Sequence, residues 1–191
     1  MNIIFATHNK NKLKEISELI PSSYNLKSLS DINCLIDIPE TGQTMREDAL
    51  LKSQFVYENY KLNCFADDSG LEVEFLNGAP GVYSARYAGE HKNDADNINK
   101  LLEELKNCSN RNAQFKTVIA LILNGQKYFF DGIIKGKITN EILGTNGFGY
   151  DPVFIPEGYS QTFAQMNLKI KNKISHRAIA VNKLINFLNK L

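Results

Sequence analysis

The spacing of apolar residues along the first thirty positions predicts a strand, a helix and a second strand. Residues 2–6 form a short apolar run, and residues 24–29 form another. Between the two runs, leucine and isoleucine recur at helical spacing from Leu13 onward, until Pro21 ends the helix. A polar loop therefore joins the first strand to the first helix.

Three further helices are predicted from the same periodicity. One begins after Thr44, where Glu47 three residues later completes a capping-box pattern, and it runs to about residue 60. Another covers 93–105, with its apolar residues on one face. The last begins at Ser175, which is a typical N-cap residue, and continues to the end of the chain.

The strongest strand signals lie in the second half of the chain, at 115–123 and 128–138. They flank Asn124 and Gly125, a pair that favours a tight hairpin turn. These two runs are therefore predicted to be neighbouring antiparallel strands.

Two adjacent aspartates, Asp67 and Asp68, follow an apolar run and precede another, which predicts strands at 63–67 and 71–76. Neighbouring side chains on a strand point to opposite faces, so both aspartates cannot face one core. Because burying an unpaired carboxylate is costly, we expect the pair at a strand end, facing a cleft, with a cation nearby. A polar turn made by residues 67–70 is an equally good interpretation of this stretch alone.

Composition and charge exclude several classes of protein. The chain has 191 residues, 43% of them hydrophobic and 23% charged, which is ordinary for a single globular domain. A formal net charge of +1, with no extended basic stripe, argues against nucleic-acid and membrane-surface binding. Three cysteines without metal-site spacing suit a reducing compartment, and no segment is long and apolar enough to span a membrane or act as a signal. We therefore expect a cytoplasmic protein.

Two loops next to helices carry candidate phosphate-binding groups. The polar loop at 7–12 enters a helix, the geometry in which amides and lysines receive a phosphate, although a solvated surface loop has the same pattern. Glu40 precedes the second helix, and Lys52 lies on that helix. A glutamate in that place usually complements the helix dipole, so it indicates no metal by itself.

The segment 144–152 is rich in glycine but does not match a Walker loop or a dinucleotide-binding motif. Phe148 and Tyr150 within it are suited to stacking on a flat ligand, although both rings are equally compatible with a core position. His176 and Arg177 lie in the first turn of the last helix, where the dipole disfavours cations. A bound anion or base edge would compensate for this arrangement.

Five segments together resemble the inosine-triphosphate pyrophosphatase family, in its order and spacing, over the whole chain. They read ATHNKNKLKEI (6–16), ETGQTMREDALLKS (40–53), FADDSGLEVEFLNGAPGVYSARYAG (65–89), GTNGFGYDPVF (144–154) and KNKISHRAIA (171–180). The resemblance implies one α/β domain over 1–191, elongated and two-lobed, with a long mixed β-sheet flanked by helices and a deep central cleft. It also implies a homodimer that hydrolyses ITP, dITP and XTP to the monophosphate and pyrophosphate with Mg²⁺.

The roles of individual residues follow from this resemblance. It places the metal on Glu40 and Asp68, with Asp67 as a further ligand or an orienting group, and makes Asp68 the general base. Lys12 and Lys52 would neutralise charge on the phosphates. The other substrate-binding positions are Thr7, His8, Asn9, Lys10, Asn11 and Ser69 for the phosphate end, and Phe148, Gly149, Tyr150, Asp151, Lys171, His176 and Arg177 for the base. A donor from His176 or Arg177 to O6, with Asp151 accepting from N1, would reject adenine.

Three positions depart from the usual family pattern: His8 replaces a frequent glycine, Asp48 an asparagine and Gln165 a glutamate. None of them removes a proposed catalytic residue, so we expect activity. A pyrophosphatase for other modified nucleotides, as in a related septum-inhibitor family, and a nucleotide-binding module without turnover are the alternatives. Ser84, Ala85 and Arg86 match the family without a role that the sequence supplies.

Overall fold

The computed structural model describes residues 2–191, which form a mixed β-sheet with helices packed against it. The strands, in the sheet order β2-β1-β3-β4-β5-β6, are β1 (Asn2–Phe5), β2 (Asn25–Ser28), β3 (Cys64–Val73), β4 (Asn112–Leu123), β5 (Gln126–Ile138) and β6 (Phe154–Pro156). The helices are α1 (Lys10–Leu19), α2 (Met45–Tyr60), α3 (Asp94–Glu104), α4 (Leu168–Ile174) and α5 (His176–Leu188). Strand β1 pairs in parallel with β2 and β3, whereas β6 is antiparallel to β5, so the expected α/β class with a mixed sheet is confirmed.

The chain divides into two compact units, each built from several stretches of sequence. The first contains the residues up to Asp68, Thr117–Gly132 and Arg177–Leu191, and the second contains Ser69–Lys116 and Ile133–His176. None of the helices in the described part of the chain combines the length and apolar composition that crossing a membrane requires.

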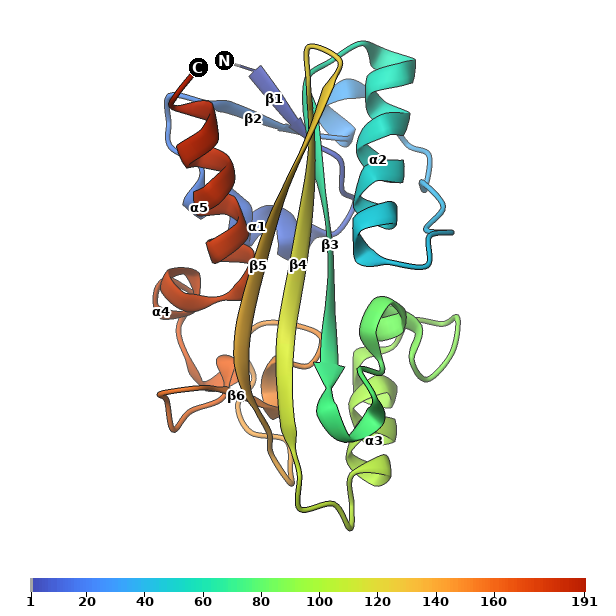
Figure 1. Cartoon of the computed structure of the whole chain (residues 1–191), viewed down its shortest axis with the longest axis vertical. Helices are drawn as coiled ribbons and strands as arrows, with labels where there is room; N and C mark the ends of the chain where they lie inside the picture. Colours follow the sequence, from blue (N-terminus) through green and yellow to red (C-terminus); the bar gives the residue numbers. More distant parts are fainter. Residues whose placement is uncertain (1) are drawn as a thin grey trace. The chain divides into compact units, whose positions relative to one another are not determined.

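The first unit has an apolar core on each face of its part of the sheet. Ile3 and Phe5 of β1 belong to one core, together with Leu184 of α5, while Ile4 between them belongs to the other, together with Val56 of α2. Helices α1 and α5 accordingly lie on one side of these strands and α2 on the other (Figure 1). Burial on both faces explains why β1 reads as an unbroken apolar run.

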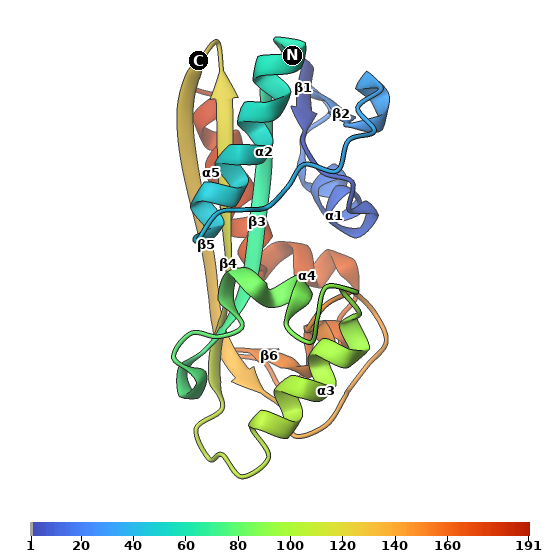
Figure 2. The same ribbon diagram turned by 90° about the vertical axis from the view of Figure 1, so that its right-hand side faces the viewer.

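The second unit packs α3 against its strands through one apolar cluster. Ile98 and Leu101 of α3 lie in this cluster with Phe115 of β4 and Phe154 of β6. The Phe115 and Phe154 rings meet edge to face, with centroids 4.7 Å apart. Figure 2 shows α3 and β6 within this part of the chain.

Most of the predicted elements are confirmed. Helix α2 begins with the predicted capping box, in which Thr44 and Glu47 each accept a hydrogen bond from the other's backbone amide. Helix α3 has Asn93 as its N-cap, and Asn124 and Gly125 form the turn between β4 and β5 with positive φ angles of 50° and 82°. Strand β6 and helix α4 were not predicted, because a three-residue strand and a seven-residue helix are too short to show a period.

The prediction that the acidic pair lies at a strand end is wrong. Asp67 and Asp68 lie in the middle of β3, which is one continuous strand instead of two, and residues 74–76 form a 3₁₀ turn. The polar-turn interpretation fails for the same reason. Both carboxylates can be buried within one strand because lysine and arginine side chains form ion pairs with them.

Candidate active site

The carboxylate of Asp67 is held by two cations of the first unit. Lys12 Nζ lies 3.0 Å from Oδ1, and Arg177 Nε donates to Oδ2 at 3.0 Å. Burial alone would raise the pKa of Asp67, but the charges of Lys12 and Arg177 hold it well below its usual range. Asp67 is therefore ionised at neutral pH, and both its oxygens face protein cations.

Arg177 lies at the start of α5, where the helix dipole disfavours a cation, and two carboxylates offset that cost. Its Nε donates to Asp67 and its Nη1 forms a short ion pair with Glu15 of α1. Burial would lower the pKa of Arg177, yet Glu15 and Asp67 raise it above its usual value. The predicted contact of Arg177 with the base stays a prediction beside these two ion pairs.

Asp68, the next residue along β3, has a contrasting environment. It is largely buried, and its Oδ1 lies 3.6 Å from Lys52 Nζ. Burial raises the pKa of Asp68 to about 6, although Lys52 and Lys12 partly offset that rise. Neighbouring carboxylates thus have pKa values shifted in opposite directions, a pattern typical of sites that carry out acid–base chemistry.

Lys52 of α2 joins Asp68 to Glu40. Its ammonium donates to Glu40 Oε1 at 2.7 Å while it approaches Asp68. Burial alone would lower the pKa of Lys52, but Asp68 and Glu40 raise it above its usual value. The structure thus brings together two predicted metal ligands and one predicted phosphate-binding lysine, whose roles stay predictions.

These residues fit a magnesium ion with two carboxylates of the protein as ligands. Mg²⁺ usually takes one or two carboxylates and completes its shell with water and substrate phosphates. Within residues 2–191, no group of three or more His, Cys, Asp or Glu side chains is close enough together to hold a metal, and Asp67 as a further ligand stays a prediction. Counting Glu15, the cluster has four carboxylates and three cations, which leaves one net negative charge before substrate binds.

The predicted phosphate loop precedes α1 and is organised by Asn9. The Asn9 side chain accepts hydrogen bonds from the amides of Asn11 and Lys12 at 2.9 and 3.0 Å, and its own amide donates to Thr7 Oγ1 at 3.1 Å. Lys10 is exposed at the start of the helix. The Lys12 ammonium is the group that this loop contributes to the charged cluster.

In the second unit, the predicted base-binding residues centre on Asp151. Its Oδ2 accepts hydrogen bonds from the Phe148 amide at 2.9 Å and from Lys171 Nζ. The Lys171 ammonium also lies 5.1 Å from the centre of the half-buried Phe148 ring. Three of the predicted residues are thus brought together, with the Phe148 ring partly open to a ligand.

Two further contacts hold this loop. The Gly149 amide donates to Asp94 Oδ2 at 2.7 Å, and the buried Tyr150 hydroxyl donates to the carbonyl of Ser84 at 2.9 Å. Ser84 Oγ in turn accepts from the Leu71 amide of β3 at 2.9 Å. The conspicuous Ser84 segment therefore connects β3, just beyond the acidic pair, with the loop that carries Phe148.

His176 and Ser69 occupy different settings. The His176 ring stacks on Phe115 with centroids 4.6 Å apart, and only 3% of the residue is exposed, so much of it serves the core. Ser69 is half-buried on β3 beside Asp68. Neither position tests the predicted contact with a substrate.

Sequence analysis missed two residues that hold the site together. Glu15 was not singled out, and its spacing of three from Lys12 was the available signal, because residues three apart share a helix face. Asp94 reads as an ordinary acidic residue in the first turn of α3. Its bond to Gly149 joins positions 55 residues apart, which no local pattern predicts.

Each of the three departures from the family pattern makes a defined contact. His8 Nε2 lies 2.9 Å from the carbonyl oxygen of Ile36, and Asp48 Oδ1 accepts from the Gly42 amide at 2.7 Å. Gln165 forms a capping box with Thr162, in which its amide oxygen does what a glutamate carboxylate would do. All three side chains therefore stabilise loops.

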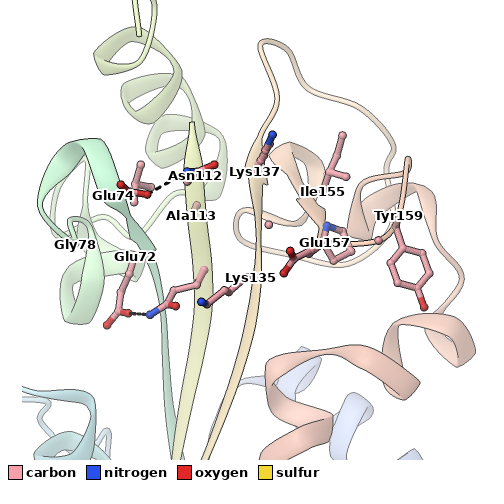
Figure 3. A pocket seen from close by; sticks show the side chains of 15 residues that line it. Glu72, Glu74, Gly78, Asn112, Ala113, Lys135, Lys137, Ile155, Glu157 and Tyr159 are labelled. Atoms are coloured by element: carbon pink, nitrogen blue, oxygen red, sulfur yellow. Dashed lines mark hydrogen bonds between the residues drawn. The ribbon is translucent and has the colours of Figure 1, made fainter. Parts of the chain in front are cut away.

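A separate groove of about 860 Å³ lies on the sheet of the second unit, and none of the residues that line it is a predicted site residue (Figure 3). Among the residues that line it, Glu72 and Glu74 accept hydrogen bonds from the side chains of Gln114 and Asn112 on the neighbouring strand. The lysines at 135 and 137 line it from β5. The groove does not belong to the charged cluster.

Comparisons with known proteins agree on one family. A family model described as the Ham1 family matches residues 3–187. A protein of Flavobacterium johnsoniae named dITP/XTP pyrophosphatase is 57% identical over 188 residues, which cover 98% of each chain. Two solved Ham1 proteins have a similar structure over the whole chain. The protein of Coxiella burnetii has a TM-score of 0.92 and 38% sequence identity, and the alignment covers 100% of each chain. The protein of Staphylococcus aureus has a TM-score of 0.90 and 41% sequence identity, and the alignment covers 100% of this chain and 99% of the other.

Proposed function

Since the chain belongs to the Ham1 family, we propose that it is a nucleoside-triphosphate pyrophosphatase that hydrolyses non-canonical purine nucleotides such as dITP, XTP and ITP. The products are the nucleoside monophosphate and pyrophosphate. Water attacks the α-phosphorus, the bond from that phosphorus to the bridging oxygen breaks, and pyrophosphate leaves. Removal of such nucleotides cleanses the pool from which nucleic acids are made.

Asp68 is the general base in this proposal. The observation that carries the assignment is the contrast within the acidic pair: cations hold both oxygens of Asp67, whereas burial raises the pKa of Asp68 to about 6. A carboxylate with a pKa close to neutrality accepts a proton from water more readily than an ordinary one. Asp67, locked by Lys12 and Arg177, acts as a positioning residue.

Lys12 and Lys52 stabilise the negative charge that gathers on the phosphates. Phosphoryl transfer depends mainly on positioning and electrostatic stabilisation, so ammonium groups fixed before substrate arrives are effective. Asp67 fixes the Lys12 ammonium at 3.0 Å, and Glu40 fixes that of Lys52 at 2.7 Å. Burial lowers the pKa of Lys12, although Asp67 and Asp68 counteract that effect.

Glu40 and Asp68 are the proposed magnesium ligands. When bound, Mg²⁺ supplies positive charge to the triphosphate and favours ionisation of a coordinated water. The two carboxylates provide hard oxygen donors, and the net negative charge of the cluster favours a cation.

The base is proposed to bind at Phe148 in the second unit. The half-buried ring offers a face for stacking, and Lys171 beside it is a hydrogen-bond donor. Hypoxanthine presents an acceptor at O6 and a donor at N1, the reverse of adenine. A donor such as Lys171 or His176, with the Asp151 carboxylate as acceptor, would leave polar groups unpaired when adenine binds.

A homodimer stays a prediction from the family resemblance, and a cytoplasmic location stays a prediction from the cysteine usage and segment composition. Light scattering coupled to gel filtration measures the first directly. A mass of one chain at working concentrations would contradict it.

The decisive test of the function is a panel of nucleoside triphosphates with pyrophosphate release as the readout. We expect ITP, dITP and XTP to be cleaved much faster than ATP and GTP, and EDTA to abolish the reaction. ATP cleaved as fast as ITP, or indifference to EDTA, would contradict the proposal. Faster cleavage of modified pyrimidine nucleotides would favour the alternative substrate class, and tight binding of Mg-ITP without turnover would favour a binding module.

A further inference from the structure

The loop that carries Glu40 is held to helix α2 at several points. The Glu40 carboxylate accepts from Lys52 Nζ at 2.7 Å, and two residues later the Gly42 amide donates to Asp48 Oδ1, also at 2.7 Å. The amides of Gln43 and Thr44 then donate to Glu47 Oε2 at 2.7 and 3.1 Å. The loop therefore approaches α2 along a continuous set of hydrogen bonds.

Among the α2 residues that bond to this loop, Asp48 is the most deeply buried. Only 1% of its surface is exposed, so its bond to the Gly42 amide is shielded from competing water. Asp48 and Lys52 are four residues apart on α2 and share a helix face, which makes the distance between their loop contacts rigid. The helix thus holds the loop both at the Glu40 side chain and at the backbone two residues beyond.

The backbone at Gly42 has no spare room. A Cβ added there would lie 2.7 Å from Glu47 Cβ and 2.8 Å from Asp48 Oδ1. A Cβ at these distances would force neighbouring atoms to move, so the loop packs tightly against α2 at Gly42. A small displacement of α2 or of Asp48 is consequently transmitted to the loop.

We propose that Asp48 is a positioning residue for the metal site, because its carboxylate fixes the Gly42 amide and so sets the position of Glu40. This inference rests on the proposed function insofar as Glu40 is taken as a metal ligand. Residues that orient a metal ligand typically change metal affinity by about 10–100-fold when removed. This role requires an oxygen at residue 48 that accepts from the Gly42 amide, and it does not require the negative charge of Asp48.

Two substitutions at Asp48 separate the hydrogen bond from the charge. Asp48→Ala removes the acceptor, whereas Asp48→Asn retains an oxygen that can accept from the Gly42 amide. Glu58→Ala is the matched control, since this exposed glutamate lies at the other end of the same helix. Gly42→Ala tests the same contact from the loop side if Asp48→Ala does not fold.

Metal binding is measured without turnover, by titrating metal-free protein with Mn²⁺ and following the electron paramagnetic resonance signal of the free ion. Asp48→Ala and Gly42→Ala are expected to bind Mn²⁺ at least about tenfold more weakly than the wild type. Asp48→Asn and Glu58→Ala are expected to stay within about threefold of it. The thermal midpoint of each variant shows whether the protein is folded at the assay temperature.

The inference is overturned if folded Asp48→Ala binds Mn²⁺ as tightly as the wild type, or if Asp48→Asn is as impaired as Asp48→Ala. If the wild type hydrolyses ITP but Asp48→Ala binds Mn²⁺ with full affinity, the role of Asp48 is refuted and the proposed function stands. Wild-type protein that binds Mn²⁺ but hydrolyses none of the nucleotides would refute the proposed function and leave the metal-binding comparison decisive for Asp48.

Discussion

Asp67→Asn and Asp68→Asn should change the free energy of unfolding in opposite directions. We expect Asp67→Asn to lower it and Asp68→Asn to raise it. The two side chains are adjacent on β3 and both are buried, so the substitutions are matched in place and in shape. Asp67 is stabilised as an anion by Lys12 and Arg177, whereas ionised Asp68 is disfavoured by its burial. The comparison therefore isolates the electrostatic environment of each carboxylate.

The size of the Asp68 effect follows from its pKa. The folded state raises that pKa from 3.8 to about 6, a shift of about two units. At about 1.4 kcal/mol per unit, ionising Asp68 costs the folded protein about 3 kcal/mol relative to the unfolded chain. Asp68→Asn should thus raise the free energy of unfolding at pH 7 by up to about 3 kcal/mol.

The effect of Asp68→Asn on stability should depend on pH in a defined direction. The folded protein binds the Asp68 proton more tightly than the unfolded chain, so stability falls as pH rises from about 4 to 6. The gain from Asp68→Asn should accordingly be absent at pH 4 and complete above pH 6. Asp67 has a lowered pKa, so its contribution is present above about pH 4 and is lost as the pH falls below that value.

Asp67→Asn should cost about 3–5 kcal/mol at pH 7, because it removes the negative charge that pairs with both Lys12 and Arg177 in a buried setting. Urea unfolding in EDTA, followed by circular dichroism from pH 4 to pH 8, measures both variants. Asp131→Asn, at an exposed position on β5, is the control and should change stability by less than about 0.5 kcal/mol. A destabilised Asp68→Asn at pH 7, or a gain that is the same at pH 4, would refute the reasoning.

Three other changes test the remaining roles. Arg177→Ala should lower the free energy of unfolding by about 3–5 kcal/mol, since it removes the cation from two buried ion pairs, with Glu15 and with Asp67; a loss below 1 kcal/mol in urea unfolding would contradict the buried ion pairs. Phe148→Ala should weaken ITP binding by about 1–3 kcal/mol through lost stacking, measured by calorimetry with Asp68→Asn protein, and unchanged affinity would remove Phe148 from the base site. Dialysis against EDTA should abolish turnover and Mg²⁺ should restore it, whereas pyrophosphate release that survives chelation would exclude the metal.

The fold could be predicted from the sequence wherever a local pattern sufficed. The capping box at Thr44 and the turn at Asn124 and Gly125 were predicted because each depends on residues close in sequence. The continuous strand β3 was not predicted, because Asp67 and Asp68 are poor strand residues without their partners. The partners of Asp67, Lys12 and Arg177, are 55 and 110 residues away from it.

The candidate site shows the same limit. The unfavourable cation at the start of α5 correctly indicated that Arg177 meets negative charge. The sequence suggested a bound anion or a base edge, whereas the structure places Glu15 and Asp67 there. Glu15 and Asp67 are 162 and 110 residues away from Arg177, so no spacing rule predicts these two contacts.

The most direct test of the central claim is the rate of pyrophosphate release from ITP by wild-type protein and by Asp68→Asn, with saturating Mg²⁺. The account predicts rapid release by the wild type and a turnover at least about 100-fold lower for Asp68→Asn, in keeping with the loss of a general base. Binding of ITP should persist in the variant. Turnover by Asp68→Asn within a few-fold of the wild type would contradict the assignment of Asp68 as the base.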